Sequence, residues 1–188
     1  MEISNAIPRR FGMRARNTIL ERDVVRPGRD AGIYALVLHL RRPGWVVAGR
    51  LGRCRLAAGW YVYVGSAKRN LPARLARHLR HEKRTHWHID YLRALACVEQ
   101  IWIWPWTEGA ECLTNGGIQA LPGASVPWNG FGWSDCRCLA HLTHFDAAPA
   151  VRGMTTPGRL VTHRGPTGDR QAKQLTPRGK GRILTPAR

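Results

Sequence analysis

Every tryptophan and every tyrosine of the 188-residue chain lies between Tyr34 and Trp133. Large aromatic side chains supply much of the apolar surface that a core buries, so the folded domain is expected at about residues 31–145. Residues 1–30 are polar and arginine-rich and predict a flexible basic leader. Residues 146–188 lack aromatic residues and are rich in glycine, proline and arginine. We expect them to form a disordered basic tail, because they cannot bury enough apolar surface to offset their chain entropy.

Short apolar runs inside this domain predict a small sheet. Gly32–Leu40 and Trp45–Ala48 lie on either side of the turn dipeptide Pro43-Gly44 and together predict an antiparallel hairpin. Trp60–Val64 and Val98–Trp104 are aromatic and β-branched, which favours two further strands.

The apolar period changes from two to about four after the third run. Leu71, Leu75 and Leu79 recur at helical spacing and predict a helix over 71–80 with basic residues on its remaining surface. A second helix is expected from Ala110, although the glycines that follow Asn115 weaken it by roughly 1 kcal/mol each. Residues 136–145 are expected to add a short closing element. The fold class predicted is therefore α/β or α+β, with a small, mainly antiparallel central sheet flanked by helices.

The charge of the chain restricts its partners. There are 30 lysines and arginines against 12 acidic residues, a formal charge of +18, and residues 31–145 alone carry 14 basic and 6 acidic residues. Such an excess attracts polyanions, and nucleic acid is the commonest one. No apolar run is long enough to cross a bilayer, and no long basic amphipathic helix favours a membrane surface. We find no secretory signal, and five cysteines are typical of reduced thiols in a cytoplasmic protein.

Two tyrosines and one arginine could form a phosphate site. Gly32-Ile33-Tyr34 and Tyr63-Val64-Gly65 each place a tyrosine beside a glycine in a strand, and the basic helix follows. A tyrosine hydroxyl can act on an attacking water if nearby cations lower its pKa from about 10. Arg74 is suited to bind phosphate oxygens and to stabilise developing negative charge. From the residues alone, however, strand tyrosines are more often part of the core.

Four ordered strings carry a family resemblance: GIYAL, YVYVGSAKRNLPARLARHLR, HWHIDYLR and GFGWSDCRCLAHL. They resemble the GIY-YIG nuclease superfamily, and within it the branch known as domain of unknown function 123, or Uri-type endonucleases. The resemblance covers residues 31–145 and neither tail. It implies a small sheet flanked by helices, a single divalent ion (Mg or Mn), and hydrolysis of phosphodiester bonds in nucleic acid.

The resemblance also implies roles for individual residues. Tyr34 and Tyr63 match the tyrosines of the two motifs, and either could be the base. Arg74 matches the helix arginine, His78 falls where relatives carry a histidine or tyrosine near the scissile phosphate, and Glu111 resembles the metal-binding glutamate. The basic residues expected to contact nucleic acid are Lys68, Arg69, Arg77 and Arg80.

The chain departs from the superfamily pattern at three places. Ser66 stands where some repair enzymes carry lysine, for which Lys68 could substitute. The residues after Glu111 are poor helix formers, which puts metal binding in doubt. The usual asparagine partner is not evident, and Asn129 and Asp135 are weak candidates.

Other metal-ligand patterns are present. Cys136, Cys138, His141 and His144 invite a zinc interpretation, to which Cys112 could contribute, but the C-x-C spacing is tighter than in common structural zinc sites. Zinc is therefore not expected, and buried thiols with a hydrogen-bonded histidine are favoured.

His86, His88 and Asp90 would share one face of a strand, where we expect a hydrogen-bonded wall near the active cleft. The tryptophans of the 98–106 segment could stack on bases but are expected in the core.

The function predicted is a metal-dependent endonuclease acting on nucleic acid, with DNA expected ahead of RNA. The alternatives are a non-catalytic nucleic-acid-binding module on the same fold and a zinc-stapled interaction domain. No separate specificity domain is evident, so structure-dependent or weakly specific cleavage is expected.

Overall fold

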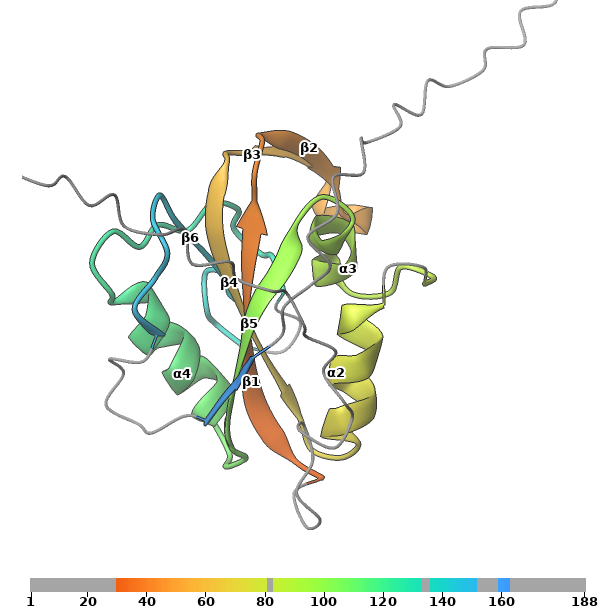
Figure 1. Cartoon of the computed structure of the whole chain (residues 1–188), viewed down its shortest axis with the longest axis vertical. Helices are drawn as coiled ribbons and strands as arrows, with labels where there is room; N and C mark the ends of the chain where they lie inside the picture. The colour runs from red at the N-terminus through yellow and green to blue at the C-terminus, as the bar shows by residue number, and fades with distance from the viewer. Residues whose placement is uncertain (1–29, 81–82, 133–135, 152–158, 163–188) are drawn as a thin grey trace, which may run out of the picture.

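The computed structural model describes residues 30–80, 83–132 and 136–151, and the backbone of residues 159–162 (Figure 1). Its elements, in chain order, are β1 (Gly32–Leu40), β2 (Gly44–Val47), the 3-10 turn η1 (Gly49–Leu51), β3 (Arg53–Leu56), β4 (Gly59–Ala67), α2 (Leu71–Leu79), α3 (His88–Arg93), β5 (Cys97–Pro105), α4 (Ala110–Gln119), β6 (Leu142–Phe145) and β7 (Arg159–Thr162). This arrangement confirms the α+β class predicted from the sequence.

A five-stranded sheet forms the centre of the molecule, in the order β6-β4-β1-β5-β7. All of its pairings are antiparallel. β1 is the middle strand and is buried along almost its whole length, so its residues contribute to the core on both faces. A near-continuous apolar run such as GIYALVLHL is what a strand covered on both faces requires.

The predicted hairpin between residues 32–40 and 45–48 is wrong. β1 pairs with β4 and β5, whereas β2 pairs with β3 in a separate two-stranded sheet. The reason is burial: Trp45 and Val47 on β2 are 54% and 58% exposed, so this short strand could not cover one edge of the fully buried β1. Their nearness in sequence did not decide the pairing.

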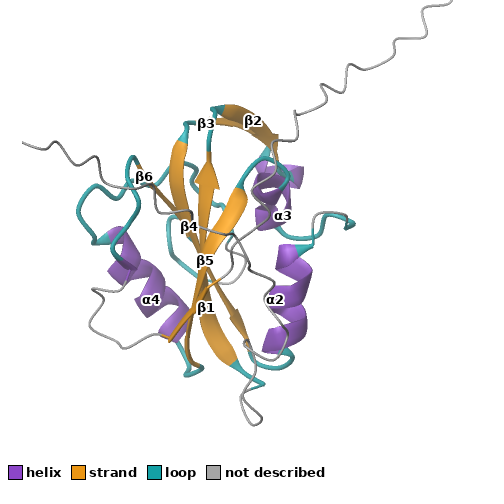
Figure 2. Ribbon diagram, in the orientation of Figure 1, coloured by secondary structure: helices purple, strands orange, loops and turns teal. Residues whose placement is uncertain are grey.

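The central sheet separates two apolar cores. Tyr34, Leu36 and Leu38 of β1 belong to one core, and Ile33 and Ala35 belong to the other, as alternation along a strand demands. α2 and α3 cover the first face and α4 covers the second, and Figure 2 shows the helices on opposite sides of the strands. None of the helices in the described ranges is long and apolar enough to span a membrane.

Both predicted helices are present. Leu71 and Leu75 of α2 are buried against the sheet, as the leucine spacing predicted. α4 runs through Gly116 and Gly117 without interruption. Its packing offsets the low helix propensity of the glycines, because Asn115 and Ile118 are buried on either side of them.

The sheet extends beyond residue 145, where the folded domain was expected to end. Val151 is 2% exposed in the second core, and the backbone of β7 pairs with β5 through four residue pairs. β7 is a four-residue strand at the sheet edge, too short for its sequence to stand out from the surrounding tail. The predicted leader, apart from Asp30, and the remainder of the predicted tail lie outside the described residues.

Candidate active site

The side chain of Tyr34, on β1, packs against a glycine of the neighbouring strand β4. Tyr34 is paired with Gly65, and a Cβ built at Gly65 would lie 2.6 Å from the Tyr34 hydroxyl oxygen. Only glycine at position 65 leaves room for the Tyr34 ring. The second glycine-tyrosine motif therefore has a steric cause, namely that Gly65 provides the surface on which Tyr34 rests.

His78 of α2 meets the hydroxyl of Tyr34. Their Nε2 and Oη atoms are 2.8 Å apart, and each residue is 1% exposed. Burial is the main reason that the pKa of His78 falls to about 3, with Lys83 and Arg74 also lowering it. The imidazole is consequently neutral near pH 7. Its Nδ1 has no hydrogen-bond partner among the described residues.

Tyr63 of β4 is the second tyrosine of the site. Its ring centroid lies 6.5 Å from that of Tyr34 and 6.3 Å from that of His78. Gly132, with a φ of +85°, packs against it, and a Cβ there would lie 2.8 Å from the Tyr63 ring. Both tyrosines thus depend on a facing glycine, one within the sheet and one in the loop that precedes β6.

Both hydroxyls stay protonated without further cations. Burial raises the pKa of Tyr34 and of Tyr63 above the usual value, and the charge of Glu111 raises both further. Arg74 opposes this, because its positive charge lowers the pKa of each. Arg74 therefore lies within electrostatic range of both tyrosines. Its guanidinium is 4.8 Å from the ring centroid of Trp87.

Glu111 approaches from the first turn of α4, within electrostatic range of Tyr34, Tyr63 and Arg74. The Ser66 hydroxyl donates to its Oε2, and Nδ1 of His141 lies 2.9 Å from its Oε1. Burial alone would raise the pKa of Glu111, but the hydrogen bonds from His141 and Ser66 outweigh it and lower the pKa. The same contact with Glu111 raises the pKa of His141 despite its burial. Glu111 is therefore a carboxylate near pH 7.

The predicted nucleic-acid-binding residues differ in availability. Lys68, Arg69 and Arg80 are exposed, and the Lys68 ammonium lies 5.7 Å from the Trp106 ring centroid. Arg77, in contrast, is bound within the protein, since its Nη1 lies 2.9 Å from Asp90 Oδ2 and its Nη2 donates to the Arg84 carbonyl.

His86, His88 and Asp90 do not share one face of a strand, because α3 begins at His88. Asp90 initiates this helix: its Oδ2 accepts hydrogen bonds from the backbone N–H groups of His86 and Trp87 at 2.9 and 3.1 Å. Alternation of polar residues resembled a strand, but the acidic residue in the first helical turn decided the local structure.

Asp90 also holds two cations, Arg77 and Lys83, each at 2.9 Å. Although burial opposes ionisation, these hydrogen bonds and those from the backbone lower the pKa of Asp90 to about 2. Its role is to hold α3 against α2.

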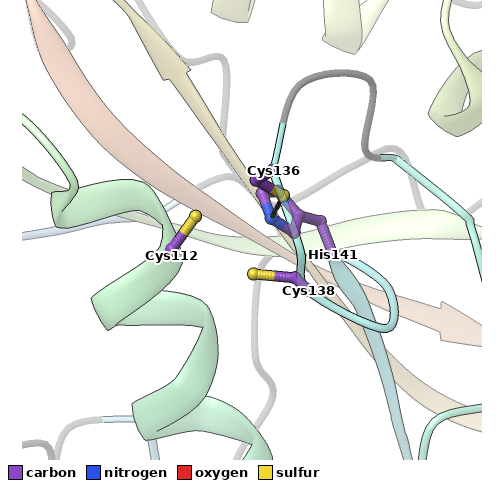
Figure 3. Close-up of side chains that lie close together, drawn as sticks. All are labelled: Cys112, Cys136, Cys138 and His141. Atoms are coloured by element: carbon purple, nitrogen blue, oxygen red, sulfur yellow. Dashed lines mark hydrogen bonds between the residues drawn. The ribbon is translucent and has the colours of Figure 1, made fainter.

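A second group of side chains lies on the α4 face. Cys112, Cys136, Cys138 and His141 bring their ligand atoms within 4.8 Å of one another, and Figure 3 shows them converging from α4 and from the segment before β6. The Cys136 sulfur is 3.3 Å from His141 Nε2. Burial, followed by the nearby thiols of Cys138 and Cys136, raises the pKa of the Cys112 thiol to about 12. Within the described ranges it is the one group of three or more His, Cys, Asp or Glu side chains close enough together to hold a metal ion.

His144 does not belong to this group, although the sequence pattern included it. Its Nε2 is 3.2 Å from the Ala58 carbonyl, and its ring lies 4.8 Å from that of Tyr61. Residues three apart in an extended segment point to opposite faces, so His141 and His144 diverge. The fourth member of the group is instead Cys112, which lies 24 residues before Cys136 in the chain.

Asn115, which was not predicted as a site residue, lies next to the backbone that leads into His141. It is buried, and its Nδ2 donates to the Ala140 carbonyl at 2.9 Å, beside a second bond from Gln119. It therefore fixes the backbone next to His141. Of the two weak candidates for the asparagine partner, Asn129 takes part in neither hydrogen bond. Asp135 lies outside the described residues. Trp102 and Trp104 are buried, as expected of core residues.

Comparison with known proteins gives the family of the chain. No curated protein and no solved structure matches it. The family described as domain of unknown function DUF123 matches residues 33–157, which include both tyrosines, α2, α4 and the cysteine group. This match covers more than half of the sequence and agrees with the branch that the four strings resemble. The chain belongs to the DUF123 family.

Proposed function

We propose that this protein is a metal-dependent endonuclease that hydrolyses phosphodiester bonds of nucleic acid, with DNA the preferred substrate. The observation that carries the proposal is the convergence of Tyr34, Tyr63, His78 and Arg74 on one face of the sheet, in a domain of net positive charge. Arginine and tyrosines near a neutral histidine are suited to binding a phosphodiester and moving a proton there.

Each residue has a role in this reaction. Arg74 binds the scissile phosphate and stabilises its developing charge. The hydroxyl of Tyr34 or Tyr63 orients the attacking water and can accept its proton only when a nearby cation lowers the tyrosine pKa. Neutral His78 can accept the hydrogen bond of the Tyr34 hydroxyl through Nε2. Lys68, Arg69 and Arg80, which are exposed, would contact the nucleic-acid backbone.

Glu111 is the residue proposed to hold a single divalent ion, Mg or Mn. It is ionised, and each of its oxygens accepts one hydrogen bond in the structure, so each retains a free lone pair. Carboxylate oxygen suits these hard cations. The ion would supply positive charge that lowers the pKa of a neighbouring hydroxyl and stabilises charge at the phosphate.

One observation favours a second function, a non-catalytic nucleic-acid-binding module. Both oxygens of Glu111 are already engaged, by Ser66 and by His141, and among the described residues no further carboxylates gather around Glu111. In that case the basic surface binds nucleic acid without an ion. Binding would then weaken steeply with salt and would not respond to a chelator.

The two functions are separated by a cleavage assay on labelled single-stranded, duplex and branched DNA and RNA, with Mg or Mn and with or without EDTA. The nuclease proposal requires cleavage of at least one substrate that EDTA abolishes. Binding without cleavage of every substrate favours the module.

Tyr63→Phe tests whether the cleavage belongs to this site. We expect it to abolish cleavage and leave binding largely intact. Tyr91→Phe, which removes a hydroxyl from a partly buried tyrosine of α3, is the matched control and should retain activity. Equal activity in the two variants would remove Tyr63 from the site.

A further inference from the structure

We propose that Cys112, Cys136, Cys138 and His141 form a zinc site, distinct from the ion proposed at Glu111. Spacing along the sequence argued against zinc because Cys136 and Cys138 are separated by a single residue. Folding supplies what that segment lacks, since α4 brings Cys112 to the same point (Figure 3). Three sulfurs and one imidazole nitrogen are a common ligand set of structural zinc.

The dimensions of the group suit one tetrahedral ion. Zinc bonds of about 2.3 Å to sulfur and about 2.0 Å to nitrogen place the ligand atoms of a tetrahedron about 3.5–3.8 Å apart. Here the four atoms lie within 4.8 Å of one another, and Cys136 Sγ and His141 Nε2 are already 3.3 Å apart. Rotations of the cysteine side chains are enough to close the remaining difference. An iron–sulfur cluster would need its ligands further apart, because iron and sulfide ions lie between them.

His141 is oriented for this role by a carboxylate. Its Nδ1 bonds to Glu111, which leaves Nε2, the nitrogen beside Cys136, to face the group. A histidine that binds zinc through one nitrogen and donates to a carboxylate through the other is a recurrent arrangement, in which the carboxylate fixes the tautomer and strengthens the ligand. The side chain of His141 is 4% exposed, so it would keep this orientation.

The backbone around the ligands is fixed independently of them. Asn115 and Gln119 of α4 both donate to the Ala140 carbonyl, which ties the segment before β6 to the helix that carries Cys112. The His141 N–H donates to Phe131 at 2.8 Å. The backbone beside His141 is therefore fixed to the helix that carries Cys112 without any metal.

Soft thiolates select zinc over the hard cations proposed for catalysis, so the two sites should not exchange metals. Zinc binds thiolates, so the three cysteines would release their protons when the ion binds. The site would join α4 to the segment before β6 and would hold Glu111 in place through His141.

The test is elemental analysis of the full-length protein, purified without added metal and after dialysis against Mg. We expect about one zinc per chain. Cys138→Ser should lower the zinc content at least ten-fold and lower the Tm. The matched control is Cys97→Ser, which changes an exposed cysteine of β5 outside the group and should change neither quantity.

A cobalt spectrum keeps the proposal testable if Cys138→Ser does not fold. The wild-type chain and Cys97→Ser, refolded with Co(II), should show thiolate-to-cobalt charge transfer and the visible bands of a tetrahedral site. Cys112→Ser should shift these bands, because the proposal includes a ligand from α4.

Three results would overturn the proposal: no zinc with no thiolate–cobalt absorption, iron in place of zinc, or equal zinc content in Cys138→Ser and Cys97→Ser. None of these readouts uses cleavage, so they do not depend on the nuclease proposal.

Discussion

Two glycines determine where the tyrosines of the site can lie. Gly65 faces the Tyr34 ring within the sheet, and Gly132 faces the Tyr63 ring from the loop before β6. These glycines are therefore needed so that the two tyrosine rings can pack. A larger residue at either glycine would displace an aromatic ring and with it the hydroxyl proposed to act on water.

Gly65→Ala tests this relation. We expect a loss of about 1–3 kcal/mol in the free energy of unfolding, typical of overpacking, and a large loss of cleavage because Tyr34 must move. Gly116→Ala is the control: it adds the same methyl group to α4 in open space and should stabilise the protein by up to about 1 kcal/mol. Urea unfolding measures both, and a neutral Gly65→Ala variant would contradict the packing described.

His78 should make the stability of the protein sensitive to mild acid. Its folded pKa of about 3 lies below the value of about 6.5 expected in the unfolded chain, so protons bind preferentially to the unfolded state. Stability should therefore fall as the pH drops below about 6.5, by up to about 1.4 kcal/mol per pH unit from this group.

His78→Gln removes the titration and keeps a hydrogen-bonding partner for Tyr34. Urea unfolding between about pH 6 and pH 5 should show a shallower dependence in this variant. His88 remains in it, and its pKa is also lowered by burial, so part of the slope should persist. An unchanged slope would show that His78 is not buried in its neutral form.

Among the elements, α3 depends most on a single side chain. The Asp90 carboxylate is fully buried, accepts two backbone N–H groups at the start of the helix and pairs with Arg77 and Lys83. Asp90→Asn should cost about 3 kcal/mol near pH 7, because it leaves two cations without a counter-charge. Asp146→Asn, at an exposed carboxylate, should have no comparable effect.

The effect of Asp90→Asn should depend on pH with a definite sign. The pKa of Asp90 is about 2 in the folded protein against 3.8 ordinarily, so its contribution is present above about pH 4 and is lost as the pH falls towards 2. The difference between wild type and Asp90→Asn should therefore be smaller at pH 3 than at pH 7. A constant difference would assign the loss to packing instead of charge.

Sequence periodicity predicted where the main helix and strands form, but it did not predict which strands pair. The leucines of α2 and the apolar run of β1 each had a clear period, and both elements formed as predicted. The pairing of β2 with β3 depended on how much of each strand is exposed, which only the folded chain decides. α3 was not predicted, because Asp90 acts through hydrogen bonds that a hydropathy pattern does not contain.

At the scale of the whole molecule, family resemblance placed Tyr34, Tyr63, Arg74 and His78 in one region, and the fold brings them together. Composition and spacing alone would have assigned the tyrosines to the core, and they are indeed buried. The Cys112 contribution to the thiol group was raised as a possibility from the sequence but could not be established from it. It requires α4 to pack beside the segment before β6, a long-range contact without a signal in local sequence.

Charge beyond the described domain should govern affinity. Residues 163–188 contain seven basic residues and one acidic residue. On the proposed function, a chain ending at residue 162 should bind DNA more weakly and lose up to about 0.9 in the slope of log K against log salt for each phosphate contact removed. Fluorescence anisotropy at several salt concentrations measures this. A full-length chain with those basic residues changed to glutamine should behave like the truncated one, and unchanged slopes would exclude a binding role.

The most direct test of the nuclease proposal is the single-turnover cleavage rate of Arg74→Ala with Mg or Mn and saturating enzyme. Arg55→Ala, at an exposed arginine of β3, removes the same charge away from the site and serves as the control. The proposal predicts a loss of at least about 100-fold in Arg74→Ala, because it removes a donor that stabilises charge at the phosphate, and near wild-type cleavage in Arg55→Ala. Equal rates in the two variants would contradict the assignment of this site to phosphodiester hydrolysis.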